Sequence, residues 1–209
     1  MAPVTPIVFV VDDDPSVRGA LDLLIRSQGW QPETFASAEE FLARPRAFAP
    51  CCLVLDVTLP ELNGLDLQKL VTADRTEMPI IFITGYGDVP MTVQAMKAGA
   101  IEFLTKPFSS EVLLRAVQQA LERSATSLGR EDAMRLLRDC HASLTPRERE
   151  VMLLVISGLL NKQVGSELGI TEITVKSHRG QVMRKMNAGS LADLVNMGAK
   201  LELDVPSKH

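Results

Sequence analysis

The sequence predicts two folded parts, an α/β part built on a parallel sheet and an all-α part that follows it. Strand-like and helix-like segments alternate five times between residues 7 and 123, and the strand signal disappears after about residue 125. Strands that alternate with helices are joined by crossover connections, which favour a parallel sheet with helices on both faces. The chain has 209 residues, 46% of them apolar, and is therefore long enough for two ordinary domains.

The strands are predicted from short apolar runs that are rich in β-branched residues. They are expected at residues 7–11, 33–35, 51–55, 79–83 and 101–104, of which 33–35 is the weakest. Apolar residues at helical spacing predict helices over 17–28, from 38 onward, and over 65–72, 89–98 and 109–123. Residues 1–123 are therefore expected to form a doubly wound, five-stranded parallel sheet.

Charged and hydroxyl side chains follow these strands, at the edge where such sheets bind ligands. They are Asp12, Asp13, Asp14, Asp56, Thr84 and Lys106. Adjacent carboxylates repel each other unless a cation compensates them, and carboxylate oxygens suit Mg²⁺. Asp12 and Asp13 are therefore expected to bind Mg²⁺ (or Mn²⁺), whereas Asp14 precedes Pro15 and is expected to cap a helix.

Asp56 is the expected nucleophile of this edge. An aspartate held beside Mg²⁺ can attack phosphorus and form an aspartyl phosphate. Asp56 stands alone on its loop, while Asp12 and Asp13 are needed as a pair on the ion. An ammonium group such as that of Lys106 would neutralise charge on the phosphoryl oxygens.

Four segments, 10–14, 53–60, 83–85 and 103–107, resemble the receiver domain of bacterial two-component systems in order, spacing and strand-end placement. Residues 83–91 and 95–100 resemble the FixJ subfamily in particular. The resemblance implies a flavodoxin-like fold, phosphorylation of Asp56 by a sensor histidine kinase, and a cis peptide bond between Lys106 and Pro107.

The same resemblance assigns further roles. Asp12, Asp13 and Asp56 would hold the ion together with the backbone carbonyl of Thr58. Thr84 and Lys106 would each bind a phosphate oxygen, and the ring of Phe103 would turn inward as Thr84 moves toward the phosphate. Phosphorylation would then drive homodimerisation through the fourth helix and the fifth strand, roughly residues 89–98 and 101–103.

The second part reads as a helix-turn-helix. A partly helical linker is expected over 124–143, with residues 124–129 as its most loop-like stretch, and an all-α four-helix domain over 144–204. Helices are expected over 146–158, 161–168, 172–187 and 190–201, and 204–209 should fray. The turn at 169–171 joins two of these helices, and the second helix can enter a major groove of DNA. Its apolar side is expected to include Ile173, Val182 and Met186.

Residues 144–151, 158–162 and 174–179 resemble the LuxR-type DNA-binding domain. The resemblance implies base contacts from Lys176 and Ser177 and phosphate contacts from Thr174, His178 and Arg179. The full set of expected DNA contacts is Lys162, Thr171, Thr174, Lys176, Ser177, His178, Arg179, Arg184 and Lys185. Gly180 departs from the longer polar residue of many relatives and offers no side chain for base contact there.

Composition limits the remaining possibilities. Residues 1–123 carry 10 Lys and Arg against 16 Asp and Glu, whereas 145–187 carry 7 against 4, which is compatible with a polyanionic partner. Three cysteines at no metal-ligand spacing argue against disulfides and a zinc site. The sequence shows no membrane span and no secretory signal, so a cytoplasmic bacterial protein without a membrane partner is expected.

The function expected is therefore a phosphorylation-gated transcription factor, with activation, and RNA polymerase as a further partner, as the family default. No enzyme activity is expected beyond slow autophosphorylation and autodephosphorylation at Asp56. Two alternatives stay open. A haloacid-dehalogenase-like phosphatase would need a second acid at position 58, where the sequence has a threonine. A DNA binder that ignores phosphate would bind DNA without regard to Mg²⁺ or a phosphodonor.

Overall fold

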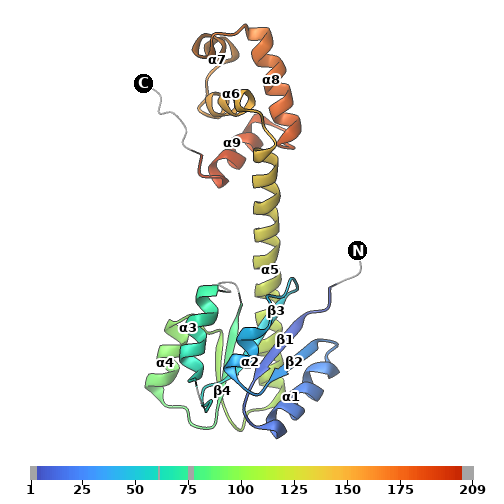
Figure 1. Ribbon diagram of the computed structural model, residues 1–209, viewed down its shortest axis with the longest axis vertical. Helices are drawn as coiled ribbons and strands as arrows, with labels where there is room; N and C mark the ends of the chain where they lie inside the picture. Colours follow the sequence, from blue (N-terminus) through green and yellow to red (C-terminus); the bar gives the residue numbers. More distant parts are fainter. Residues whose placement is uncertain (1–3, 61, 75–77, 204–209) are drawn as a thin grey trace. The chain divides into compact units, whose positions relative to one another are not determined.

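The computed structural model describes residues 4–60, 62–74 and 78–203. The chain divides into two compact units, Met1–Gly129 and Arg130–His209 (Figure 1). The tail predicted to fray, residues 204–209, lies outside the described residues, as does the last residue of the predicted 144–204 domain. Among the described residues, no helix is long and apolar enough to cross a membrane.

The first unit is a five-stranded parallel sheet, as the sequence predicts, and its strand order is β2-β1-β3-β4-β5. Its strands are β1 (Ile7–Val11), β2 (Gln31–Phe35), β3 (Cys51–Asp56), β4 (Ile80–Thr84) and β5 (Glu102–Thr105). Its helices are α1 (Pro15–Ser27), α2 (Ala38–Ala43), α3 (Gly64–Asp74), α4 (Val89–Lys97) and the first part of α5 (Ser110–Ala142). The alternation of strand and helix is thus confirmed, and β2 begins two residues before the predicted 33–35.

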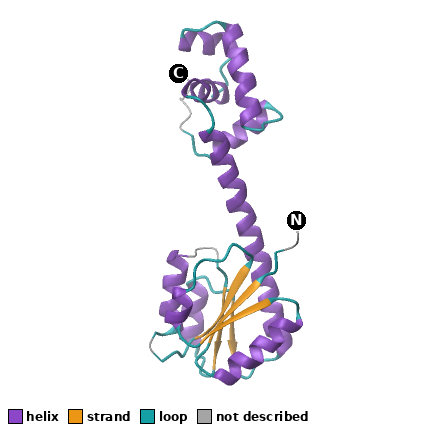
Figure 2. Cartoon of the chain, turned by 45° about the vertical axis from the view of Figure 1, so that its right-hand side comes forward, coloured by secondary structure: helices purple, strands orange, loops and turns teal. Residues whose placement is uncertain are grey.

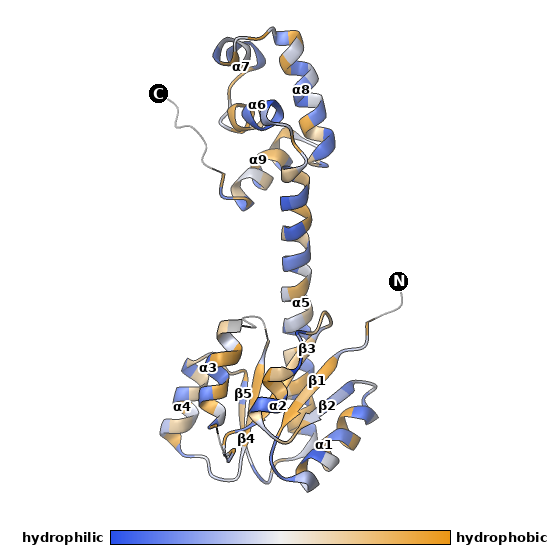
Figure 3. Ribbon diagram, viewed as in Figure 1, coloured by the Kyte–Doolittle hydropathy of each residue, from blue (hydrophilic) through white to orange (hydrophobic). Residues whose placement is uncertain are grey.

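Helices cover both faces of the sheet because alternate strand residues point to opposite sides (Figure 2). Phe9 and Val11 of β1 join α2, α3 and α4 in one apolar cluster. Val8 and Val10 join α1 and α5 in the other. The β1, β3 and β4 strands are buried along their whole length and form the apolar centre of this unit (Figure 3).

Side-chain caps fix where several helices begin. The Asp14 carboxylate accepts a hydrogen bond from the Ser16 amide at 2.8 Å, with Pro15 at the first helical position, which confirms the predicted cap of α1. Ser37 caps α2 and Asp88 caps α4 in the same way. The first turn of α1 therefore begins just after the aspartates that follow β1.

The α5 helix differs from expectation at residues 124–129, which were predicted to be the most loop-like stretch and are helical. Tertiary contact overrides their low helix propensity. Ser124 is buried, and its hydroxyl accepts a hydrogen bond from the Cys51 amide at 3.0 Å. The Thr126 hydroxyl donates to the Glu122 carbonyl at 2.9 Å and so does not compete with the helix.

The second unit is all-α and has its own apolar core. It contains α6 (Pro146–Ile156), α7 (Asn161–Leu168), α8 (Glu172–Lys185) and α9 (Leu191–Lys200), packed around residues that include Val151, Met152, Val164, Val175 and Leu194. The helix predicted over 172–187 ends at Lys185, and Asn187 adopts a positive φ of 53°. The turn between α7 and α8 uses Gly169 at a φ of 65°, a conformation that glycine adopts without strain.

Glu148 has two structural roles in this unit. Its carboxylate accepts the Thr145 amide in a capping box and forms an ion pair with Lys185 of α8 at 2.7 Å. The hydrogen bond from Lys185, together with those at Thr145, lowers the pKa of Glu148 below its usual value. A carboxylate with a lowered folded-state pKa stabilises the fold above its unfolded pKa and loses that contribution as pH falls through the folded value.

We therefore expect Glu148→Gln to lower the stability of the second unit by about 1–2 kcal/mol at neutral pH. The difference from wild type should shrink as pH falls below the ordinary glutamate pKa of about 4.3 and through the lowered pKa of the folded state. Thermal unfolding of the full chain checks this, with ellipticity following both units and Trp30 fluorescence following the first alone. A difference that persists unchanged at low pH would contradict it.

Candidate functional site

An acidic cluster lies where β1 and β3 end. Asp12 and Asp13 follow β1, and Asp56 is the last residue of β3, the neighbouring strand. One carboxylate oxygen from each of the three lies within 4.8 Å of the others. Asp12 and Asp56 are buried, whereas Asp13 is exposed. The structure thus brings the three predicted ligands together at a site that opens to solvent.

Lys106 reaches into this cluster from the end of β5. Its Nζ donates to Asp12 Oδ2 at 2.8 Å and to Asp56 Oδ2 at 2.7 Å. Its amide donates to the Thr84 carbonyl at 2.7 Å, which aligns the turn after β5 with the end of β4. The Lys106–Pro107 peptide bond is cis, as predicted.

The charges of the cluster depend on one another. Burial raises the pKa of Asp12 above its ordinary value, an effect that the hydrogen bond from Lys106 reduces. Burial alone would lower the pKa of Lys106, but the hydrogen bonds to Asp12 and Asp56 outweigh it, so its pKa is raised. Lys106 is therefore a stable cation beside the two carboxylates.

The donor set fits a hard divalent cation. Three carboxylates within one ligand shell are all-oxygen ligands, which Mg²⁺ and Mn²⁺ prefer. Asp12 Oδ1 also accepts the Asp14 amide at 2.9 Å, and Asp56 Oδ1 accepts the Thr58 amide at 2.8 Å. The hydrogen bond that the structure gives Thr58 is thus made by its amide, and a role for its carbonyl stays a prediction.

Thr84 and Phe103 belong to the last two strands of the sheet, β4 and β5. The Thr84 side chain is buried, and its Oγ1 forms hydrogen bonds of 3.2 Å with the amide and the carbonyl of Tyr86. The Phe103 ring is partly buried and packs 6.1 Å from the Phe82 ring, centre to centre. In this structure the Thr84 hydroxyl therefore bonds to the loop after β4.

Two glycines that the sequence does not predict as site residues position these groups. A Cβ on Gly64 would meet the Asp56 carbonyl oxygen and lie 2.9 Å from Val57 Cα. A Cβ on Gly87 would lie 2.8 Å from Thr105 Cγ2 and 3.1 Å from Phe103 Cε1. The sequence shows only that these residues are glycines. It does not show which atoms of other segments lie close to them, because that depends on the folded structure.

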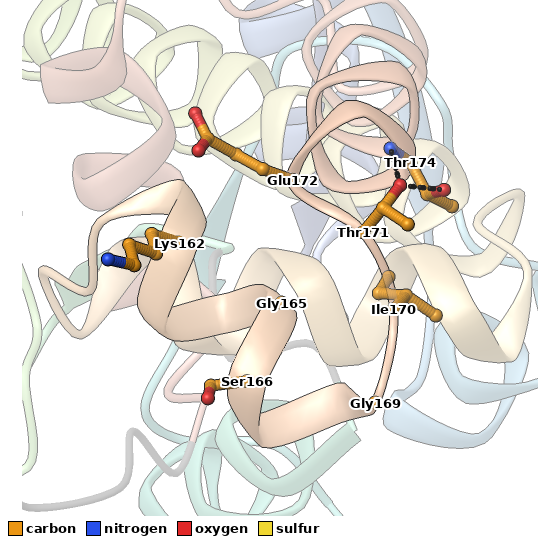
Figure 4. A pocket seen from close by; sticks show the side chains of 8 residues that line it. All are labelled: Lys162, Gly165, Ser166, Gly169, Ile170, Thr171, Glu172 and Thr174. Carbon is orange, nitrogen blue, oxygen red and sulfur yellow. Dashed lines mark hydrogen bonds between the residues drawn. The ribbon is translucent and has the colours of Figure 1, made fainter.

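A second candidate site lies on the second unit, where α7 meets α8. Thr171 caps α8, with its Oγ1 accepting the Thr174 amide at 3.2 Å and lying 2.9 Å from Thr174 Oγ1. Both threonines and Lys162 line an open groove of about 670 Å³ (Figure 4). A Cβ on Gly165 would lie 2.8 Å from the Ile170 carbonyl oxygen, so glycine allows the two helices to meet closely here.

The other predicted DNA contacts on α8 differ in how far their side chains are exposed. Lys176, Ser177 and Arg184 are exposed, and Lys176 pairs with Glu172 at 3.1 Å. His178 and Arg179 are half-buried, and Arg179 donates to Asn161 Oδ1 at 3.1 Å.

Lys185 stands apart from these residues. Its Nζ lies 2.7 Å from Glu148 and 3.2 Å from the Ser143 carbonyl, so it has partners within its own unit. Its contact with DNA stays a prediction.

The prediction that Ile173 belongs to the apolar side of α8 is wrong. Its side chain is 80% exposed, whereas Val182 and Met186 are buried. The physical reason is helical phase. Val175, two positions after Ile173, is buried, and two positions are more than half a turn apart on a helix.

Two protein families match successive parts of the chain. Residues 8–118 match the response regulator receiver domain, and residues 142–198 match the bacterial regulatory proteins of the luxR family. The chain belongs to the response regulators that join a receiver domain to a LuxR-type domain. The predicted family and fold class are thereby confirmed, and this family comprises transcription factors and not classical enzymes.

Individual response regulators align over almost the whole chain. Nodulation protein W of Bradyrhizobium diazoefficiens is 51% identical over 93% of this chain and 86% of its own length. The transcriptional regulatory protein FixJ of Azorhizobium caulinodans is 42% identical over 91% of this chain and 90% of its own. The low-resolution structure of the response regulator StyR is 49% identical, with a TM-score of 0.86 over 94% of this chain and all of that one.

Proposed function

We propose that this response regulator binds DNA under the control of phosphorylation at Asp56. The observation that carries the proposal is the position of the Asp56 carboxylate. It ends a buried strand, shares an acidic cluster with Asp12 and Asp13, and lies 2.7 Å from the Lys106 ammonium. The same chain carries a helix-turn-helix whose second helix exposes cationic side chains.

The proposed reaction is transfer of a phosphoryl group from a phosphohistidine of a sensor kinase. An Asp56 carboxylate oxygen attacks phosphorus, an O–P bond forms, and the P–N bond breaks. The bond's electron pair goes to the histidine nitrogen of the donor, which takes up a proton from solvent. Mg²⁺ or Mn²⁺, held by Asp12, Asp13, Asp56 and the Thr58 carbonyl, would neutralise negative charge on the transferred group.

Lys106 and Thr84 would complete the phosphoryl-binding site. The Lys106 ammonium already bonds Asp56 Oδ2 and would shift to a phosphoryl oxygen once Asp56 is modified. The Thr84 hydroxyl would exchange its hydrogen bonds with Tyr86 for one with the phosphoryl group. Movement of Thr84 would free space beside β5 for an inward turn of the Phe103 ring.

This rearrangement would alter the surface of α4 and β5, which we propose as the homodimer contact. The α4 helix exposes an apolar strip with 76% of Val89, 44% of Val93 and 43% of Met96 accessible. These residues recur at positions i, i+4 and i+7, so they lie on one face of the helix. Dimerisation would present two DNA-binding units to two half-sites about one helical turn of DNA apart.

The DNA interface would be formed by α7 and α8. Lys162, Thr171 and Thr174 at the groove would contact phosphates. Lys176 and Ser177 would face base edges, with His178, Arg179, Arg184 and Lys185 nearer the phosphate backbone. RNA polymerase is a further partner if binding activates transcription.

Intact mass after incubation with acetyl phosphate and Mg²⁺ tests the phosphorylation step. Wild type should gain one phosphoryl group in a Mg²⁺-dependent manner, and Asp56→Ala should gain none. Asp66→Ala, which removes an exposed carboxylate on α3, is the matched control and should behave as wild type. Absence of an adduct on wild type with several donors would favour a DNA binder that ignores phosphate.

The kinase would approach Asp56 along α1. A groove of about 640 Å³ runs between α1 and the turn after β5, and its apolar lining includes Leu23, Leu24 and Phe108. Lys106, which bonds Asp56, lines the same groove, so an occupant of the groove lies next to the phosphoacceptor. We propose that a helix of the sensor kinase docks there.

Leu23→Asp should therefore slow phosphotransfer from a kinase by roughly tenfold or more, because it places a charge on an apolar contact. The side chain is 72% exposed, so the fold should not change. Phosphotransfer is measured with the fastest donor from a panel of autophosphorylated kinase domains, and labelling by acetyl phosphate should be unaffected. Leu70→Asp on α3 is the control, and equal slowing of both variants would argue against docking at α1.

A further inference from the structure

Ile173 is an apolar side chain without an apolar environment. It lies in the first turn of α8 and is 80% exposed, more than any other large apolar residue described in α6, α7, α8 or α9. It belongs neither to the buried core of the second unit nor to the half-buried residues packed against that core. It is also absent from the lining of the groove between α7 and α8. Within the unit, therefore, Ile173 does not contribute to the apolar core.

The face of α8 that carries Ile173 also carries exposed polar residues. Ser177, Gly180 and Arg184 follow Ile173 at i+4, i+7 and i+11, which places all four within a narrow strip along the helix. Each of the four is exposed. Lys176, at i+3, flanks the strip and is exposed as well. The buried residues of α8, Val175 and Val182, lie on the opposite side.

The middle of this strip carries only small residues. Gly180 has no side chain, and a Cβ built there would meet nothing within 4 Å. Ser177 is the next residue of the strip and is also small. A long side chain at position 180 would hold the helix away from a flat partner, whereas glycine and serine allow close approach. Ile173 is then the largest apolar group that such a partner would meet.

We propose that Ile173 reads the 5-methyl group of a thymine in the major groove of the target DNA. This inference rests on the proposed function, because it assumes that α8 enters DNA. The first residues of a recognition helix contact base edges, and the thymine methyl is the one apolar group that the four bases expose in the major groove. Ile173 would thereby set a preference for a T·A pair that the cationic residues cannot set.

The charge of the strip favours DNA over a protein partner. Lys176 and Arg184 lie on or beside the same face as Ile173, and Lys162 lines the adjacent groove. A protein that buried Ile173 in an apolar pocket would also have to desolvate or pair these cations. The phosphates that border a major groove supply their partners on both sides.

The test combines in vitro selection with a thermodynamic cycle. The full-length chain, treated with acetyl phosphate and Mg²⁺, selects from a random duplex library, and Ile173→Ala is selected in parallel. Affinities of both proteins are then measured for the duplex that wild type enriches, and for duplexes in which single thymines are replaced by uracil. Uracil lacks only the methyl group, so every hydrogen bond of the base is retained. Leu136→Ala, which removes a side chain 63% exposed on α5, is the control.

Wild type should enrich a site with a thymine that Ile173→Ala does not select. Replacement of that thymine by uracil should weaken wild type roughly three- to fivefold, the effect of one buried methyl. The same replacement should leave Ile173→Ala unchanged, while Leu136→Ala should respond as wild type does. The thermal unfolding midpoint of Ile173→Ala should equal that of wild type, because the side chain is exposed.

Two other outcomes would overturn the inference in distinguishable ways. If wild type enriches a site but Ile173→Ala loses equal affinity for thymine and uracil duplexes, Ile173 does not read a methyl group, and the inference fails while the proposed function stands. If wild type enriches no sequence at all, the proposed function fails, and the inference fails with it.

Discussion

Gly64→Ala should abolish most of the phosphorylation of Asp56, because the added methyl group would displace Asp56. The added methyl would overlap the Asp56 carbonyl oxygen and come within 2.9 Å of Val57 Cα, and both of these are backbone atoms that cannot rotate away. The Gly64 amide also donates to the Val57 carbonyl at 3.0 Å. To make room for the methyl, the end of β3 and the start of α3 would have to move apart, which would strain this hydrogen bond. We expect a loss of about 1–3 kcal/mol in stability, typical of overpacking.

The phosphorylation rate of Gly64→Ala should fall by about a hundredfold, because a shift of about 1 Å in a reacting group has an effect of that size. Initial rates of labelling by acetyl phosphate, measured below the unfolding temperature of the variant, check this. Gly19→Ala is the matched control. A Cβ there meets nothing within 4 Å, so it should leave the rate unchanged. Equal labelling of Gly64→Ala and wild type would show that Asp56 does not depend on this packing.

Lys106→Met should slow labelling of Asp56 by roughly ten- to a hundredfold, because it removes a cation aimed at the developing negative charge. It should also change how Mg²⁺ affects stability. Without the ammonium, which contacts Asp12 at 2.8 Å and Asp56 at 2.7 Å, the two carboxylates repel each other. Mg²⁺ that compensates this repulsion should raise the unfolding midpoint of the variant more than that of wild type.

Lys69→Met is the control for this experiment. Lys69 pairs with Asp66 at 2.7 Å on the surface of α3, where both side chains are more than half exposed. Its replacement should change neither the labelling rate nor the response to Mg²⁺. A Lys106→Met protein that labels at the wild-type rate would remove Lys106 from the account of phosphoryl transfer.

The acidic cluster could be predicted from the sequence because strand order and strand ends determine it. Asp12 and Asp56 each end a run of buried apolar residues, and parallel strands bring their carboxyl ends to one edge. The cap of α1 could also be predicted, because Asp14 and Pro15 act within one turn. These features depend on local pattern or on the geometry of the sheet as a whole.

The features that could not be predicted from the sequence depend mostly on contacts between residues that are distant along the chain. Ser124 lies in a loop-like composition but is helical, and it is held by the Cys51 amide 73 positions away. Lys185 reads as a cation of α8 available to DNA, yet Glu148 of α6 pairs with it. The sequence pattern predicts the wrong side of α8 for Ile173, because apolar spacing over the first turn of a helix does not determine which face is buried.

The central claim is that phosphate on Asp56 changes the affinity for DNA, and the measurement that tests it most directly is a binding titration. Wild type and Asp56→Ala are titrated by fluorescence anisotropy against the duplex that wild type enriches from the random library, with Mg²⁺, with and without acetyl phosphate, at one salt concentration. The account predicts that acetyl phosphate tightens wild-type binding by about fivefold or more, within the usual range of coupling between sites, and leaves Asp56→Ala unchanged. Equal tightening in both proteins, or a wild-type affinity that ignores acetyl phosphate despite a confirmed adduct on Asp56, would contradict it.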